Sequence, residues 1–499
     1  MSNYKLVLFV LLFIGSLSSA QTNASHTQAI TVDASASSRP FPHFWEHMFG
    51  SGRAILSLRE SYQDDLRSVK KITDFQYVRS HAIFHDEAGV YDEDAQDGPV
   101  YNFSYVDQIY DSLLQDGVRP FVELSFMPNK LAAKDIHQAF WYKPNISPPK
   151  DWKRWEDLIQ QFAVHLIERY GTEEVAQWYF EVWNEPNLDF WAGEPKQETY
   201  WDLYDHTAAA LKRVDSRLRI GGPATAQAAW VDAFIAHCVQ KHIPMDFVST
   251  HVYANDPADK VFGTGENIPR DQFVCRAVKK VHDQIAASVR PDIPLIWSEF
   301  NASYKNEPEI TDSVYMGPWL AATIRQCDGL VNEMSYWTFS DVFEEQGVVK
   351  QPFYGGFGLI AAGGVPKPSY AAFEALHNLG DQRIPLNSDS ALATRRSDGS
   401  LVLAVWNLVP PDQRGSPKTI SIRLLHTGKV HATISRVDSD HGDFHASYQK
   451  MGSPRYPTPE QLQQLRKAVE LPAPETRDLN NGELTITLPA EGLAVIEVK

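Results

Sequence analysis

The sequence predicts a (β/α)8 barrel followed by an all-β, sandwich-like domain, and three patterns indicate this fold. The first is a series of eight short runs of apolar, β-branched and aromatic residues that end in polar residues. The second is a set of amphipathic helical patterns between these runs, as a parallel sheet covered on both faces requires. The third is a change to short strand-like runs after about residue 375. A barrel of this kind closes with eight strands, each followed by a helix, and eight strand-like runs are present.

The barrel strands are expected at residues 43–49, 74–81, 119–126, 178–185, 218–223, 246–253, 294–301 and 333–341. Among the helices between them, residues 151–170 place five apolar side chains on one face, and Gly171 follows as a stop signal. Those five are Trp155, Leu158, Ile159, Phe162 and Leu166. The barrel domain is therefore expected over residues 40–374.

The tail is expected to be all-β over residues 375–499, because turn residues separate its strand-like runs and little helix is predicted. These runs are residues 401–406, 419–424, 430–437, 484–488 and 493–498. A further run at 29–32, within the N-terminal segment 21–39, is expected to add a strand to this domain. Residues 453–481 are rich in Pro, Gln and Glu and should be mostly loop, with one short helix near 459–469.

The first twenty residues have the pattern of a secretory signal peptide. Lys5 precedes an apolar run at 6–14, and small residues at 15–20 provide a cleavage site. The apolar run is well short of the roughly 20 residues that a membrane-spanning helix needs. The mature chain is expected to begin near Gln21 and to be secreted or periplasmic.

Composition limits the partners. The chain of 499 residues is 43% hydrophobic and 22% charged and carries a net charge of -17, which is typical of a soluble globular protein and argues against nucleic-acid or membrane binding. The three cysteines, Cys238, Cys275 and Cys327, lack metal-ligand spacing and are expected to be buried thiols. One disulfide in an oxidising compartment is the alternative.

Two glutamates, Glu185 and Glu299, stand where apolar strand-like runs break into polar loop. Glycoside cleavage needs one carboxylic acid to protonate the leaving oxygen and one carboxylate to act on the sugar carbon. A single glutamate at a strand end is usually a solvated charge. Here, however, both fall at the carboxyl ends of expected strands four and seven, where the reacting groups of such barrels lie.

An ordered set of motifs makes the sequence resemble glycoside hydrolase family 39, most closely its bacterial β-xylosidase branch. Besides the strand ends Asn-Glu-Pro at 184–186 and Ser-Glu-Phe-Asn at 298–301, the motifs are residues 50–54, 120–128, 336–337, 343–345 and 354–358. The resemblance covers nearly the whole mature chain. It departs beside the strand-two histidine, where Ser80 and Ala82 replace glycines that the family often shows.

The resemblance implies that Glu185 is the general acid/base and Glu299 the nucleophile of a retaining mechanism. It implies substrate contacts for Asn184, His81, His251, Tyr253, Tyr304, Trp337 and Glu344. Arg79 is expected either to orient the nucleophile or to pair structurally with Glu123 or Glu181. No metal or other cofactor is implied.

The leading functional hypothesis is therefore an exported retaining exo-glycosidase that releases xylose from the non-reducing ends of xylo-oligosaccharides. The same mechanism on another glycoside (an arabinoside, galactoside, glucoside or iduronide) is the alternative within enzymes. A non-catalytic carbohydrate-binding barrel is the alternative from another class, and it is disfavoured because both glutamates are present. The oligomeric state is not indicated by the sequence.

Overall fold

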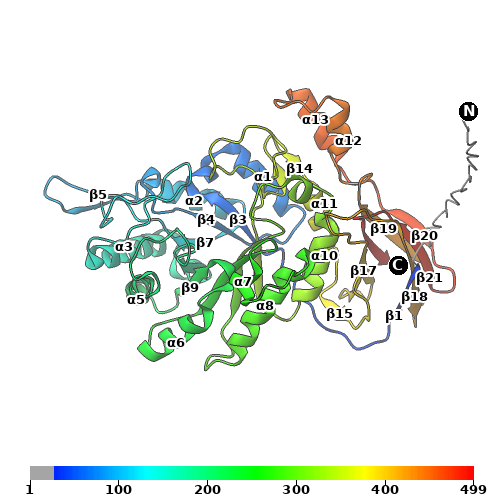
Figure 1. The fold of residues 1–499 in the computed structure, drawn as a ribbon, viewed down its shortest axis with the longest axis horizontal. Helices are drawn as coiled ribbons and strands as arrows, with labels where there is room; N and C mark the ends of the chain where they lie inside the picture. Colours follow the sequence, from blue (N-terminus) through cyan, green and yellow to red (C-terminus); the bar gives the residue numbers. More distant parts are fainter. Residues whose placement is uncertain (1–26) are drawn as a thin grey trace, which may run out of the picture.

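Eight parallel strands close into a barrel in the computed structural model, which describes residues 27–499 (Figure 1). The strands are β3 (Met48–Arg53), β4 (Tyr77–His81), β7 (Arg119–Leu124), β8 (Tyr179–Val182), β9 (Arg219–Thr225), β10 (Phe247–Tyr253), β11 (Leu295–Asn301) and β12 (Glu333–Tyr336). They neighbour one another in chain order, and β12 pairs with β3 to close the ring. The predicted (β/α)8 barrel is confirmed. The largest shifts are in the first strand, which lies at Met48–Arg53 instead of 43–49, and in the last, which ends at Tyr336 instead of residue 341.

Helices surround the barrel, and the longer ones connect successive strands. They are α1 (Glu60–Lys70), α2 (Ser104–Gln115), α3 (Trp152–Tyr170), α4 (Thr172–Val175), α5 (Lys196–Val214), α6 (Val231–Lys241), α7 (Ala258–Phe262), α8 (Arg270–Ala286), α9 (Pro308–Thr311), α10 (Met316–Cys327) and α11 (Pro368–Leu376). Helix α3 shows how the sequence sets their limits. The Asp151 side chain accepts hydrogen bonds from the first backbone N–H groups, and Gly171 follows the last turn with a positive φ.

Short elements decorate the strand ends. Three are 3-10 helices, η1 (Ala54–Leu58), η2 (Asp86–Ala88) and η3 (Ala226–Ala228), and four strands form the hairpins β5 (Tyr91–Glu93) with β6 (Pro99–Tyr101) and β13 (Ile360–Ala361) with β14 (Val365–Pro366). The β13–β14 hairpin follows the 354–358 loop, which borders the candidate site described below.

The tail forms two sheets that face each other beside the barrel (Figure 1). The larger sheet has the order β2 (Arg39–Pro40), β15 (Gln382–Ile384), β16 (Ala391–Arg395), β17 (Leu401–Trp406), β22 (Leu493–Val498), β19 (His431–Val437) and β20 (Glu475–Asp478). The smaller contains β1 (Thr27–Asp33), β18 (Lys418–Leu425) and β21 (Glu483–Leu488). Buried residues from both sheets, such as Ile30, Ile422 and Ile496, share one apolar core. The early segment that was expected to add a strand is β1, which pairs in parallel with β18.

The β-domain packs against the barrel through α10 and α11. Trp406, Val437 and Leu493 of the larger sheet belong to the same buried cluster as Phe373 of α11. The chain passes from α11, which ends at Leu376, to β15, which begins at Gln382. Outside these sheets, α12 (His445–Lys450) and α13 (Pro459–Ala468) form a small helical pair, and α13 lies where one short helix was expected.

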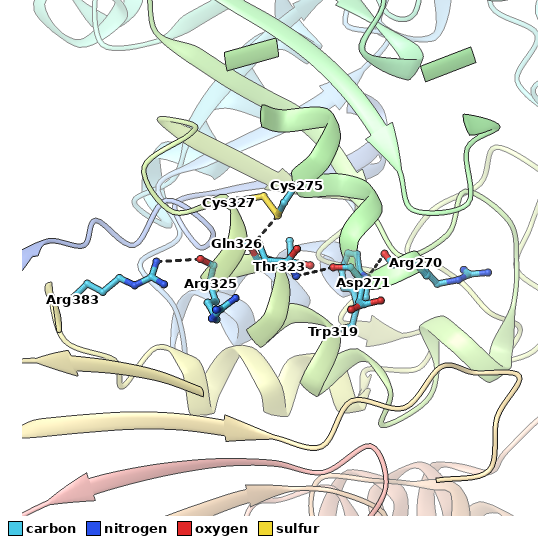
Figure 2. The surroundings of a disulfide bond; sticks show 9 residues. All are labelled: Arg270, Asp271, Cys275, Trp319, Thr323, Arg325, Gln326, Cys327 and Arg383. Carbon is cyan, nitrogen blue, oxygen red and sulfur yellow. Dashed lines mark hydrogen bonds between the residues drawn. A yellow bond between two sulfur atoms is a disulfide. The ribbon is translucent and has the colours of Figure 1, made fainter. Parts of the chain in front are cut away.

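A disulfide joins Cys275 of α8 to Cys327 at the end of α10 (Figure 2). The expectation of three buried thiols is therefore wrong for these two residues and holds for Cys238. The two helices pack side by side and are also linked by a hydrogen bond from Gln326 Nε2 to the Asp271 carbonyl at 2.9 Å. The 52-residue separation of the two cysteines in sequence concealed this proximity.

The predicted signal peptide, residues 1–20, lies outside the described residues. Among residues 27–499, no helix has the length and apolar character that crossing a membrane would require.

Candidate active site

The two predicted glutamates meet at the carboxyl ends of barrel strands four and seven. Glu299 lies in β11, and Glu185 follows β8 with a φ of 44°, in a tight turn just before Pro186. His251 of β10 lies between them, with Nδ1 3.1 Å from Glu185 Oε1 and 3.6 Å from Glu299 Oε1. One carboxylate oxygen of each glutamate lies within 4.8 Å of the other. A strand-end pair that the sequence separated by 114 positions is thus brought together.

Glu299 receives two strong hydrogen bonds. Arg79 Nη1 donates to Oε1, and the Tyr253 hydroxyl donates to Oε2, both at 2.6 Å. Both donors stabilise the ionised carboxylate. Burial raises the pKa of Glu299, while the Arg79 charge and the Tyr253 hydrogen bond oppose that rise.

Arg79 also ties the floor of the site together. It is fully buried, and its remaining nitrogens contact Glu181 Oε2 at 2.6 Å, Glu123 Oε2 at 2.7 Å and Asn184 Oδ1 at 3.0 Å. Glu123 and Glu181 are paired in register on neighbouring strands, so two like charges face each other there. Arg79 therefore makes the contacts that both expected roles require, because it pairs with the nucleophile candidate Glu299 and with Glu123 and Glu181. We call Arg79, Glu123, Glu181 and Glu299 the Arg79 cluster.

His251 and Ser298 link Glu185 to Glu181 of the Arg79 cluster. The Ser298 hydroxyl donates to Glu181 Oε1 at 2.7 Å, so its oxygen can only accept from His251 Nε2–H, 3.1 Å away. Burial, and then the charge of Arg79, hold the pKa of His251 well below its usual range, so the ring is neutral. Nδ1 is then an acceptor, and the hydrogen bond to Glu185 requires a proton on the Glu185 carboxyl group.

The pKa shift of Glu185 is consistent with a protonated carboxyl group. Burial and the nearby charge of Glu299 raise the pKa of Glu185 well above the usual range of a carboxyl group. Among residues 27–499, no Arg or Lys pairs with Glu185, which contacts the neutral His251, whereas Glu299 contacts Arg79. Two like charges at this separation share one proton, and the environment places it on Glu185.

His81 and Glu345 form a second polar edge. His81 Nδ1 lies 2.6 Å from Glu123 Oε2, and its Nε2 lies 3.5 Å from Glu345 Oε1. Burial lowers the pKa of His81, but the charge of Glu123 and its hydrogen bond outweigh this and raise it overall. Burial also raises the pKa of Glu345 to about 8, and its Oε1 has no hydrogen-bond partner among the described residues. A buried oxygen without a hydrogen bond, on the side of the site that holds His81, is suited to a sugar hydroxyl.

Glu344, the predicted sugar ligand of this segment, is engaged elsewhere. Its two oxygens accept hydrogen bonds from Arg59 at 2.6 and 3.0 Å and from Arg53 at 3.0 Å. These ion pairs hold its pKa below the usual range against the effect of burial. The structure thus gives Glu344 a pairing role and places its neighbour Glu345 against His81.

An aromatic wall closes the apolar side of the site. Trp337 follows β12 and clusters with Tyr253, Phe343 and Phe357. Its ring packs against Gly50 of β3, where an added Cβ would lie 2.1 Å from an indole carbon, so only glycine fits. Trp337 also lies 4.7 Å from the His81 ring, between ring centres. It is in place to support the apolar face of a sugar.

The loop that carries Phe357 rests on a second buried charge cluster. Lys367 Nζ lies 2.7 Å from both Asp312 and Asp341 and donates to the Gly356 carbonyl at 2.9 Å. The two carboxylates accept hydrogen bonds from the backbone N–H groups of Gly355 and Gly358, each at 2.7 Å. We call Lys367, Asp312 and Asp341 the Lys367 cluster.

Two further predicted contacts sit at different depths. Asn184 is buried beside Arg79, directly before Glu185. Tyr304 is 41% exposed, with its ring 6.2 Å from that of Tyr253, and therefore lies at the rim.

Sequence reasoning missed Glu345, although it is part of the Phe-Glu-Glu motif at 343–345. Two adjacent glutamates in a loop give no pattern that says which one points inward.

A closed (β/α)8 barrel with two carboxyl groups at the ends of strands four and seven defines a class of barrel glycoside hydrolases. Comparison with known proteins agrees. The sequence profile of glycosyl hydrolases family 39 matches residues 28–485. The chain therefore belongs to this family and is an O-glycoside hydrolase.

Two bacterial relatives and one solved structure share most of their length with it. A beta-xylosidase of Geobacillus stearothermophilus is 37% identical over 472 residues, which cover 92% of this chain and 93% of the relative. A beta-xylosidase of Caldicellulosiruptor saccharolyticus is 35% identical over 469 residues, 91% and 94% of the two chains. The crystal structure of a monomeric beta-xylosidase from Caulobacter crescentus CB15 matches with a TM-score of 0.85 and 34% identity, over 95% of this chain and 99% of that one.

Proposed function

We propose that this protein is a retaining β-xylosidase that removes xylose from the non-reducing ends of xylo-oligosaccharides by double displacement. The observation that carries the proposal is the pair Glu185 and Glu299, with carboxylate oxygens within 4.8 Å. Retaining enzymes hold their carboxyl groups about 5 Å apart, whereas inverting enzymes need roughly 6.5–9.5 Å to admit a water molecule.

In the first step, Glu299 attacks the anomeric carbon while Glu185 gives its proton to the leaving oxygen. Arg79 and Tyr253 keep Glu299 ionised for this attack. In the second step, Glu185, now a carboxylate, takes a proton from water as that water displaces Glu299 from the sugar. The neutral His251 accepts the hydrogen bond of Glu185 in the resting enzyme and offers no competing acid.

Substrate choice is proposed from the relatives, which are named beta-xylosidases, and from the charges at the site. A uronic acid substrate calls for a cation that its carboxylate can pair with. The guanidinium groups of Arg79 and Arg53 are already ion-paired, to Glu299 and Glu344 respectively among other partners. The Glu345 oxygen that accepts no hydrogen bond among the described residues instead favours a neutral, hydroxyl-bearing sugar.

Kinetics on aryl glycosides test this substrate class. We expect kcat/KM for an aryl β-xyloside to exceed that for the matched α-L-arabinoside, β-galactoside and β-glucoside. The Glu299→Gln variant, which is nearly isosteric, serves as the blank. A higher kcat/KM for any of the other three sugars would overturn the xyloside assignment.

Export is a separate proposal. It rests on Lys5, the apolar run at 6–14 and the small residues before Gln21. N-terminal sequencing of protein recovered from periplasm or culture fluid should find a chain that begins near Gln21. Retention of Met1 in cytoplasmic protein would contradict it.

A further inference from the structure

Three side chains with metal-ligating atoms converge at the opposite end of the barrel from the glutamate pair. His43 and Glu46 lie just before β3, and His377 follows α11. His43 Nδ1 is 2.6 Å from Glu46 Oε1, and His377 Nδ1 is 2.9 Å from Glu46 Oε2. One donor atom from each residue lies within 4.8 Å of the other two. Each imidazole thus directs its Nδ1 atom toward the Glu46 carboxylate.

The surroundings of this cluster carry excess negative charge. Glu46 is fully buried, and two further carboxylates approach the neighbouring His47: Glu333 Oε2 at 3.2 Å and Asp74 Oδ2 at 3.5 Å. Three carboxylates, those of Glu46, Glu333 and Asp74, therefore lie beside the imidazoles of His43, His47 and His377. Their combined negative charge attracts a divalent cation.

Access and rigidity also suit an ion. The His377 side chain is 44% exposed, so the cluster opens to solvent on one side, while the His43 side chain is 17% exposed and stacks on the Trp45 ring at 4.4 Å. The backbone is anchored as well, because Met334 N of β12 donates to the Phe44 carbonyl at 2.8 Å. Two ligands are therefore fixed to the barrel, and the third closes the site from the surface.

We propose that His43, Glu46 and His377 form a site for a divalent transition metal, with zinc as the best match. Two imidazole nitrogens and one carboxylate are an established zinc donor set, and a water molecule would fill the fourth, open position. Zinc-to-ligand distances of about 2.0–2.1 Å place tetrahedral ligands about 3.3 Å apart, so the present contacts need to widen only slightly. Binding releases any Nδ1 protons to solvent.

The placement gives the metal a mechanical role. It would tie the segment that enters β3 to the end of α11, from which the chain runs to β15 of the β-domain. Both catalytic glutamates lie at the other ends of the strands. The ion is therefore expected to stabilise the fold and to leave the chemistry unchanged.

Calorimetric titration of the full mature chain, purified without a histidine tag and stripped with chelator, tests the site. We expect zinc to bind with a stoichiometry of at least one per chain and to raise the melting temperature in a saturable manner. His377→Gln, a change at a half-exposed side chain, should weaken the tightest binding by at least about tenfold. It should also remove most of the zinc-dependent rise in melting temperature.

His237→Gln is the matched control, because His237 Nε2 pairs with a single carboxylate, Asp205, at 2.8 Å, and no third metal-ligating group joins them among residues 27–499. This variant should bind zinc like the parent. The comparison also separates the site from any zinc held by the active-site carboxylates, which both variants retain. Equal zinc affinity in the parent and His377→Gln, or no saturable binding in the parent, would overturn the proposal.

Discussion

The Arg79 cluster and the Lys367 cluster are both buried cations surrounded by carboxylates, yet they do different work. In the Lys367 cluster the two aspartates, nearly inaccessible, turn their oxygens to backbone N–H groups of the 354–358 loop. In the Arg79 cluster Glu299 is also buried, but it faces a second carboxyl group, Glu185. In the Lys367 cluster, backbone N–H groups stabilise the excess negative charge. In the Arg79 cluster, a proton on the neighbouring Glu185 reduces it.

The comparison indicates that a buried ion pair can take part in catalysis when one of its carboxylates is not fully bound by the protein and remains free to contact a substrate. Burial raises the pKa of Asp341 to about 6, but Lys367 and the Gly358 N–H keep that carboxylate bound to the protein. Glu185 has no such backbone donor among its described contacts and holds a proton instead. Four substitutions, ordered from the largest expected effect to the smallest, can break or sharpen this comparison.

Glu299→Gln should abolish turnover while preserving the fold. Removing the nucleophile closes the covalent route, so kcat should fall by more than the roughly 10⁴-fold that general acid catalysis alone contributes. The amide oxygen can still accept from Arg79, and the amide NH2 can donate to the Tyr253 hydroxyl oxygen, so urea unfolding should change little. Substantial residual activity that survives repurification would contradict the nucleophile assignment.

Glu185→Ala should slow hydrolysis of xylosides with poor leaving groups by about 10²–10⁴-fold, and much less for activated aryl xylosides, whose departure needs little protonation. Azide, which attacks the glycosyl-enzyme without base assistance, should restore turnover and yield the β-glycosyl azide. The same rescue of Glu299→Ala should give the opposite anomer. Equal losses on good and poor leaving groups, with no azide effect, would move the acid role to another carboxylate, first to Glu345.

Lys367→Met should lower the free energy of unfolding, whereas Glu299→Gln should lower turnover and leave stability nearly unchanged. It leaves two buried aspartates without their cation, which should cost about 3–5 kcal/mol of unfolding free energy. Urea denaturation measures this directly. The control is Lys279→Met, at an exposed pair with Asp283, which should change stability by less than about 1 kcal/mol. A Lys367→Met protein as stable as the parent would show that the second cluster does not hold the loop.

Tyr253→Phe should give the smallest effect, a loss in kcat/KM of about tenfold at neutral pH, because one hydrogen bond to a charged group disappears. The Tyr253 hydroxyl lowers the pKa of Glu299, so its removal raises that pKa. Glu299 must be ionised to attack, and the acidic limb of the kcat/KM profile should therefore move to higher pH. An acidic limb that stays in place or moves to lower pH would show that the hydroxyl does not tune Glu299.

Periodicity was enough to predict the barrel, because buried parallel strands read as apolar runs whose polar ends mark the site. The glutamate pair followed from those ends, and family resemblance supplied the surrounding residues. The burial of Arg79 among three carboxylates, the inward turn of Glu345 and the Cys275–Cys327 bond did not follow. They depend on side-chain direction and on contacts between segments far apart in sequence, which no local pattern encodes.

The anomeric configuration of the first-formed product tests the central claim, that Glu299 is a nucleophile and Glu185 its acid/base partner. Proton NMR of an aryl β-xyloside reaction, followed from the first turnovers, distinguishes the two anomers before mutarotation mixes them. Double displacement predicts that β-xylose appears first and α-xylose only later. Initial release of α-xylose would mean inversion by direct attack of water and would contradict the account.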